Sequence, residues 1–98
     1  MGTITLWVLM NMSIMADWGQ TRYIAHHPDQ YSETFNPLLR GDPSIGKVDV
    51  YFLAGLMFHN GVMIALPKKH RPYYAGAVMA VETYFVISNN QIGIKVDF

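Results

Sequence analysis

The sequence predicts an all-α membrane protein with three transmembrane helices and a long polar loop between the first and the second. Charged residues make up 14% of the 98-residue chain and hydrophobic residues 51%, whereas a soluble domain carries about 25% charged residues. The apolar residues gather in three runs, each near the roughly 20 residues that a helix needs to cross a bilayer. We therefore expect residues 1–98 to form a single domain that lies in a membrane, with the lipid bilayer as its first partner.

Composition also excludes several classes of function. The formal net charge is zero, and a nucleic-acid-binding surface needs a basic stripe, so we expect no nucleic-acid partner. The chain has no cysteine, which excludes thiol catalysis, disulfides and thiolate metal sites. His26, His27 and Asp29 lack a fourth ligand at a spacing that suits a tetrahedral metal. We expect no cofactor and no metal.

The first predicted span covers residues 3–23. Met1–Thr21 contains no Lys or Arg, and Asp17 is its only charged residue. Residues three and four positions apart line up along a helix, so the polar residues of this span share one face. They are Ser13, Asp17, Gln20 and Thr21. We expect this face to be turned inward, away from lipid.

Residues 22–47 form the predicted polar loop, which is too long for a tight turn and has signals for a short helix of its own. Pro28 suits the first turn of a helix. Asn36-Pro37 should end it, because proline disfavours a helical conformation at the residue before it. Asp42-Pro43 is typical of a cap and first turn, so we expect the second long helix to begin near Pro43.

The second and third predicted spans cover residues 48–67 and 73–94. The basic link between them, residues 68–71, is so short that the two spans should be antiparallel neighbours. The end of the chain alternates apolar and polar residues over 92–98, which is also typical of the last strand of an outer-membrane barrel. The rest of the chain lacks this alternation, and apolar runs of this length favour helices.

Two polar layers are predicted inside the bundle. A charge at bilayer depth costs at least about 2.5 kcal/mol on insertion scales, so Glu82, at the centre of the third span, needs a partner. The span midpoints place His59 at the same depth, and a hydrogen bond between the two would lessen the burial penalty of both groups. The second layer lies nearer the long loop and should gather Asp17, Gln20, Thr21 and Asn89 beneath the loop residues Glu33 and Asn36.

These polar residues have three interpretations. They bond across helices and hold the bundle together, they mark a proton, cation or metal path, or they contact a partner subunit. The sequence alone leaves all three open.

The distribution of positive charge predicts the orientation. Dense Lys and Arg residues mark the cytoplasmic side of a membrane protein. Lys68, Lys69 and Arg71 lie within four residues, whereas the positive charges of the other side are spread over a long loop and the tail. We predict that the N-terminus and the basic link are cytoplasmic, and that the loop and the C-terminus lie outside.

Two short motifs in the first half of the chain carry a resemblance. Asp17 is followed four residues later by Thr21, and Glu33 precedes Asn36-Pro37 before the second span. In this pattern the chain resembles a group of small multi-span membrane proteins of bacteria and their phages, although two residues separate Glu33 from Asn36 where that group has one. The resemblance implies a multi-pass protein of the bacterial inner membrane, often phage-encoded, with no assigned chemistry.

Three functions follow from these observations, and an enzyme is the least expected. The first is a phage or prophage protein that acts by assembly into a homo-oligomer or by binding a host membrane protein, with a holin-like lysis protein as one version. The second is a minimal proton- or cation-conducting oligomer that uses His59 and Glu82. The third is an accessory subunit of a larger membrane complex.

Overall fold

The computed structural model describes residues 2–27 and 44–98, which form three helices and contain no strand. The helices are α1 (Thr3–His26), α2 (Ile45–Ala65) and α3 (Arg71–Gln91). The prediction of an all-helical chain with three long helices is confirmed. Most of the predicted polar loop, with its short helix and the site candidates Glu33 and Asn36, lies outside the described residues.

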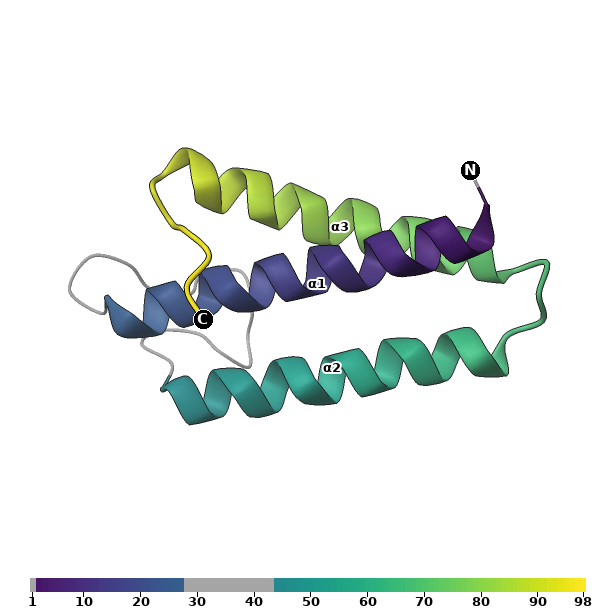
Figure 1. Cartoon of the computed structure of the whole chain (residues 1–98), viewed down its shortest axis with the longest axis horizontal. Helices are drawn as coiled ribbons and strands as arrows, with labels where there is room; N and C mark the ends of the chain where they lie inside the picture. Colours follow the sequence, from purple (N-terminus) through teal and green to yellow (C-terminus); the bar gives the residue numbers. More distant parts are fainter. Residues whose placement is uncertain (1, 28–43) are drawn as a thin grey trace.

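The central helix of the bundle is α1, which runs parallel to α3 and antiparallel to α2 (Figure 1). It packs more extensively on α3 than on α2, whereas α2 and α3 have few contacts with each other. The two helices joined by the basic link are antiparallel, as predicted, but α1 provides most of the packing surface for each of them. This arrangement leaves the side between α2 and α3 open.

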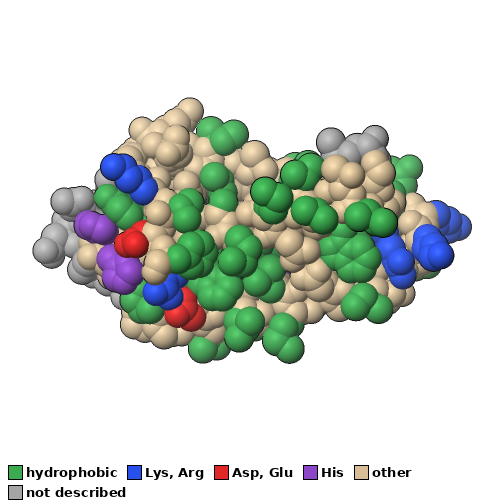
Figure 2. Space-filling model, viewed as in Figure 1, with side chains coloured by type: hydrophobic (Ala, Val, Ile, Leu, Met, Phe, Trp, Pro, Cys, Tyr) green, Lys and Arg blue, Asp and Glu red, His purple; other side chains and the backbone are tan. Residues whose placement is uncertain are grey.

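A small core lies along the two faces of α1. Met10 and Met63 have no exposed surface, and the other buried members of the core cluster are Ile14, Val48, Phe52 and Ala75. Hydrophobic side chains also cover much of the middle of the surface in Figure 2, while charged side chains gather at the two ends. The chain therefore leaves a large part of its apolar surface exposed.

Side chains that precede and follow α2 in the sequence cap its two ends. The Ser44 hydroxyl accepts a hydrogen bond from the Lys47 backbone N–H at 3.2 Å, so the helix begins at Ile45, close to the start that the sequence predicts near residue 43. At the other end, the Arg71 guanidinium donates to the carbonyls of Ile64 and Leu66, each at 3.0 Å. A cation suits this end of a helix, where carbonyl groups lack partners. Arg71 thus ties the start of α3 to the end of α2.

The third helix ends at Gln91, before residue 94, where the predicted span ends. Gly93 has a φ of 96°, a left-handed conformation that glycine adopts readily and that commonly terminates helices. The chain then turns back along α1 (Figure 1), where Ile94 is buried and the Asp97 backbone N–H donates to the Gly19 carbonyl at 3.0 Å. The tail is therefore part of the bundle.

Candidate functional site

A pair of carboxyl groups joins α1 to α3. The carboxyl groups of Asp17 and Glu82 lie close enough to interact. Ionised carboxylates have acceptors only and repel each other, so a hydrogen bond between them requires a proton on one of the two groups. Oε2 of Glu82 is buried, and no N–H or O–H donor of the described chain is bonded to it. We therefore expect the pair to hold one proton between them.

Three further polar residues extend the carboxyl pair along the same interface. The Thr21 hydroxyl donates to the Asp17 carbonyl at 2.9 Å and lies 3.5 Å from Asp17 Oδ1. Gln20 donates to the Val86 carbonyl at 2.9 Å, and its own side-chain oxygen accepts from Asn89 at 3.3 Å. The structure thus brings together the four residues of the predicted second layer, between α1 and α3.

His59 has a different partner from the one that the sequence suggests. Its Nδ1 lies 2.6 Å from the Tyr74 hydroxyl, in a hydrogen bond whose direction depends on the tautomer. This bond, and the contact between the Asp17 and Glu82 carboxyl groups, differ from the predicted pairing of His59 with Glu82. Tyr74 also belongs to α3, so His59 does reach that helix, near its start. Glu82 lies further along α3, which packs mainly on α1.

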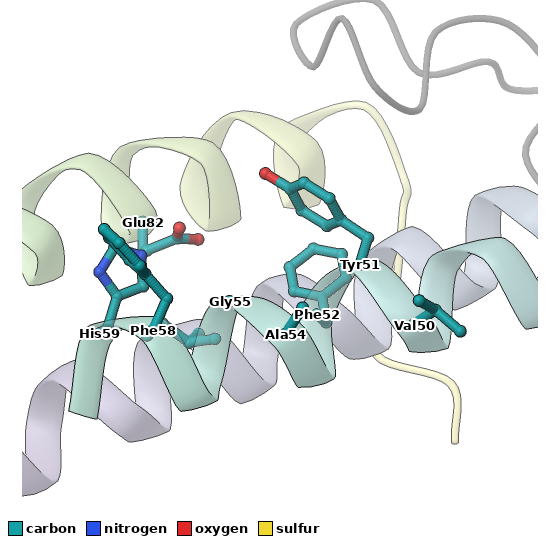
Figure 3. Close-up of a pocket in the computed structure, with 9 residues that line it drawn as sticks. Val50, Tyr51, Phe52, Ala54, Gly55, Phe58, His59 and Glu82 are labelled. Atoms are coloured by element: carbon teal, nitrogen blue, oxygen red, sulfur yellow. The ribbon is translucent and has the colours of Figure 1, made fainter. Parts of the chain in front are cut away.

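His59 and Glu82 nevertheless line the same cavity. It has a volume of about 410 Å³ and lies on the open side between α2 and α3. Figure 3 shows Glu82 reaching from α3 and His59 from α2 into this space, beside Phe58 and Gly55. The cavity has mainly apolar walls, so one histidine and one carboxyl group supply most of its chemistry.

A second polar cluster, between α1 and α2, was not predicted. The Trp7 indole N–H donates to Asn60 Oδ1 at 2.7 Å. The Asn60 side-chain amide donates to Asn11 Oδ1 at 2.8 Å, and Asn11 donates in return at 3.1 Å. Asn11 and Asn60 each lie within an apolar run. A polar amide in each of two apolar runs was the signal from which a hydrogen bond between them could have been predicted.

Asn60→Leu is expected to lower the free energy of unfolding by about 1–2 kcal/mol, because Trp7 and Asn11 would both lose a buried partner. Thermal unfolding of the detergent-solubilised protein measures the effect. Asn90→Leu is the matched control, since Asn90 is exposed on α3. Equal stabilities of the two variants would show that the cluster does not hold α1 to α2.

A third cluster joins α1 to the start of α2. One terminal nitrogen of Arg22 lies 2.6 Å from both carboxylate oxygens of Asp49. The Trp18 indole N–H also donates to Asp49, at 2.8 Å. The Arg22 side chain is 19% exposed and that of Asp49 is 38% exposed. This ion pair joins α1 to α2 at the end of the bundle opposite the basic link.

Neither a metal site nor a known relative identifies the function. Among residues 2–27 and 44–98, no group of three His, Asp or Glu side chains is placed to hold a metal ion. Comparisons with protein families, curated proteins and solved structures gave no match for this chain.

Proposed function

We propose that this chain is a small membrane protein whose three helices lie together in the bilayer. Among the described helices, α2 is the one that is long and apolar enough to cross a membrane, and only 17% of its apolar stretch is buried. A core helix of a soluble protein would be mostly buried. On α2, the exposed fractions of Val50, Met57 and Ile64 are 70%, 70% and 68%. An apolar surface of this kind suits the hydrocarbon core of a bilayer.

The observation that carries this proposal is the outward apolar face of α1 and α3. Their polar side chains bond to each other across the interface, as Gln20 does with Asn89. Large apolar side chains are exposed on the other faces, namely Ile4, Val8, Met12 and Met15 of α1 and Val81, Tyr84 and Ile87 of α3. A soluble bundle has the reverse arrangement. Inward polar groups that bond across helices allow α1 and α3 to accompany α2 through the bilayer.

Helix length and charge placement agree with this proposal. Helices of 21 to 24 residues are about 32–36 Å long at 1.5 Å per residue, against a hydrocarbon core of about 30 Å. Charged side chains lie at the two ends of the bundle in Figure 2. We propose the bacterial inner membrane as the location, with the N-terminus and the basic link in the cytoplasm. The resemblance to small bacterial and phage membrane proteins supports that choice.

Cysteine labelling tests the membrane placement on a chain that has no natural cysteine. A membrane-impermeant maleimide should label Lys47→Cys from outside intact cells and Lys68→Cys only from inverted vesicles. Met57→Cys, exposed in the middle of α2, is the control and should resist labelling from both sides. Efficient labelling of Met57→Cys in membranes would contradict a span at α2, and reversed labelling of the other two would contradict the orientation.

Within the membrane, we propose that the chain acts by assembling with other membrane helices, either its own copies or a host membrane protein. The open side between α2 and α3 supports assembly. So do Gly55 and Gly61 of α2, where an added Cβ would meet nothing within 4 Å, since small residues allow another helix to approach closely. A holin-like lysis protein and an accessory subunit of a larger complex are two forms of this proposal.

Purification in mild detergent followed by native mass spectrometry tests assembly. A homogeneous homo-oligomer supports self-assembly, and a host membrane protein present in fixed stoichiometry supports the subunit form. A monomer without a partner would contradict both. Permeabilisation of expressing cells at a defined time separates the lysis form from the others.

A minimal proton- or cation-conducting oligomer is the second candidate. The specific observation in its favour is the close approach of the Asp17 and Glu82 carboxyl groups next to the cavity that Glu82 and His59 line, because two such groups favour a shared proton. Intramembrane carboxyl groups often mark proton or cation paths. The sequence suggests His59 and Glu82 as the groups of such a path, whereas the contact between carboxyl groups favours Asp17 and Glu82. Ion flux in proteoliposomes tests it.

A further inference from the structure

A second cavity lies at the end of the bundle that carries the basic link. It has a volume of about 390 Å³ and is enclosed by the start of α1 and the link between α2 and α3. Its lining residues are Thr3, Ile4, Trp7, Lys68 and Arg71. Two cationic side chains, one hydroxyl and one indole thus surround a single space.

The charges around this cavity are all of one sign. Asp17, Asp49, Glu82 and Asp97 are the acidic residues of the described chain, and none of them lines the cavity. The first turn of α1 contains no acidic residue and no side-chain cap, so the free N–H groups of this helix start add to the positive field. Arg71 is held in place by the carbonyls of Ile64 and Leu66.

We propose that this cavity binds the phosphate headgroup of an anionic membrane phospholipid. Arginine and lysine are the side chains that bind phosphate oxygens best, and basic pockets between transmembrane helices on the cytoplasmic side bind anionic headgroups. Trp7 and Ile4 provide an apolar wall for the part of the lipid next to the phosphate, and an indole suits this depth of the membrane. The inference rests on the proposed membrane placement, under which this end of the bundle lies at headgroup depth.

Lipid titration of the detergent-solubilised full chain, followed by native mass spectrometry, tests the proposal. Phosphatidylglycerol should remain bound where phosphatidylcholine does not. Lys68→Gln should weaken phosphatidylglycerol binding about tenfold, since a direct hydrogen bond between the ammonium group and a phosphate oxygen would be lost. Lys68 is the variant of choice because Arg71 also holds the end of α2.

Two control variants separate a site from general surface attraction. Lys69→Gln changes the neighbouring residue, which does not line the cavity, and Lys47→Gln changes an exposed lysine at the start of α2. Both should bind lipid as the natural chain does. Equal losses in Lys68→Gln and Lys69→Gln, or equal binding of both lipids, would overturn the site.

A competition assay separates the two sources of phosphate. Displacement of the lipid by millimolar inorganic phosphate would overturn the choice of a lipid headgroup in favour of free phosphate. The cysteine labelling described above reports membrane placement independently. A chain that spans the membrane but does not select phosphatidylglycerol would therefore refute this inference alone.

Discussion

Glu82→Gln is expected to abolish pH-dependent ion flux in proteoliposomes while leaving the bundle folded and about as stable as the natural chain. Glutamine keeps the shape of glutamate, and its amide supplies the donor that the shared proton supplies in the bond to Asp17. It has no proton to release in the physiological range, so a path through this group would be closed. A pH-sensitive dye inside the liposomes measures flux, and thermal unfolding in detergent measures stability.

Two other variants make this experiment specific. Glu82→Ala should lower the free energy of unfolding by about 1–3 kcal/mol, because the partly buried Asp17 carboxyl group then loses its partner on α3. Asp49→Asn should also lower the free energy of unfolding, by about 1–2 kcal/mol. The Arg22 cation would lose its ionised partner, but water already screens this partly exposed pair. Asp49→Asn should leave flux intact.

The results distinguish the two interpretations of the carboxyl pair. Flux that persists in Glu82→Gln would exclude the conducting oligomer and leave the pair with a structural role. A loss of stability in Glu82→Gln as large as that in Glu82→Ala would show instead that the two carboxyl groups share no proton in the folded chain.

Gly19→Val is expected to release the C-terminal tail from α1 and to lower the free energy of unfolding by about 1–3 kcal/mol, as overpacking of a close contact does. A Cβ at Gly19 would collide with the Val96 side chain and lie 2.7 Å from Cε2 of Phe98. The bonds that hold the tail would be lost with it, including the 2.8 Å contact between the His26 ring and Asp97. Faster digestion by carboxypeptidase measures the release.

Gly76→Val is the matched control for the tail experiment. Gly76 lies within α3, and a Cβ added there would meet nothing within 4 Å. Valine has a better helix propensity than glycine, so this variant should be as stable as the natural chain or slightly more so. If both variants digest at the same rate, then the packing at Gly19 does not hold the tail.

The number of helices and their approximate limits could be predicted from the sequence, because long apolar runs leave few alternatives to a helix. The exact ends of the helices depend on capping residues and glycines, whose effects are harder to predict from the sequence. Ser44 caps α2 although Asp42-Pro43 is also a good start signal. Gly93 ends α3 earlier than the apolar run suggests, since its left-handed backbone turns the chain back toward α1. The membrane placement stays a prediction for all three helices, and α2 is the one described helix that is long and apolar enough to cross a bilayer.

The sequence by itself determined which polar residues share a helical face, because a three- and four-residue spacing places Asp17, Gln20 and Thr21 together whatever surrounds them. Only the tertiary structure decided their partners. Equal depth made His59 the expected partner of Glu82, but depth says nothing about which helices touch. Because α3 packs mainly on α1, Glu82 lies against Asp17, whereas His59 reaches α3 nearer its start and bonds to Tyr74. The carboxyl pair is thus a product of helix packing, which no single stretch of the chain encodes.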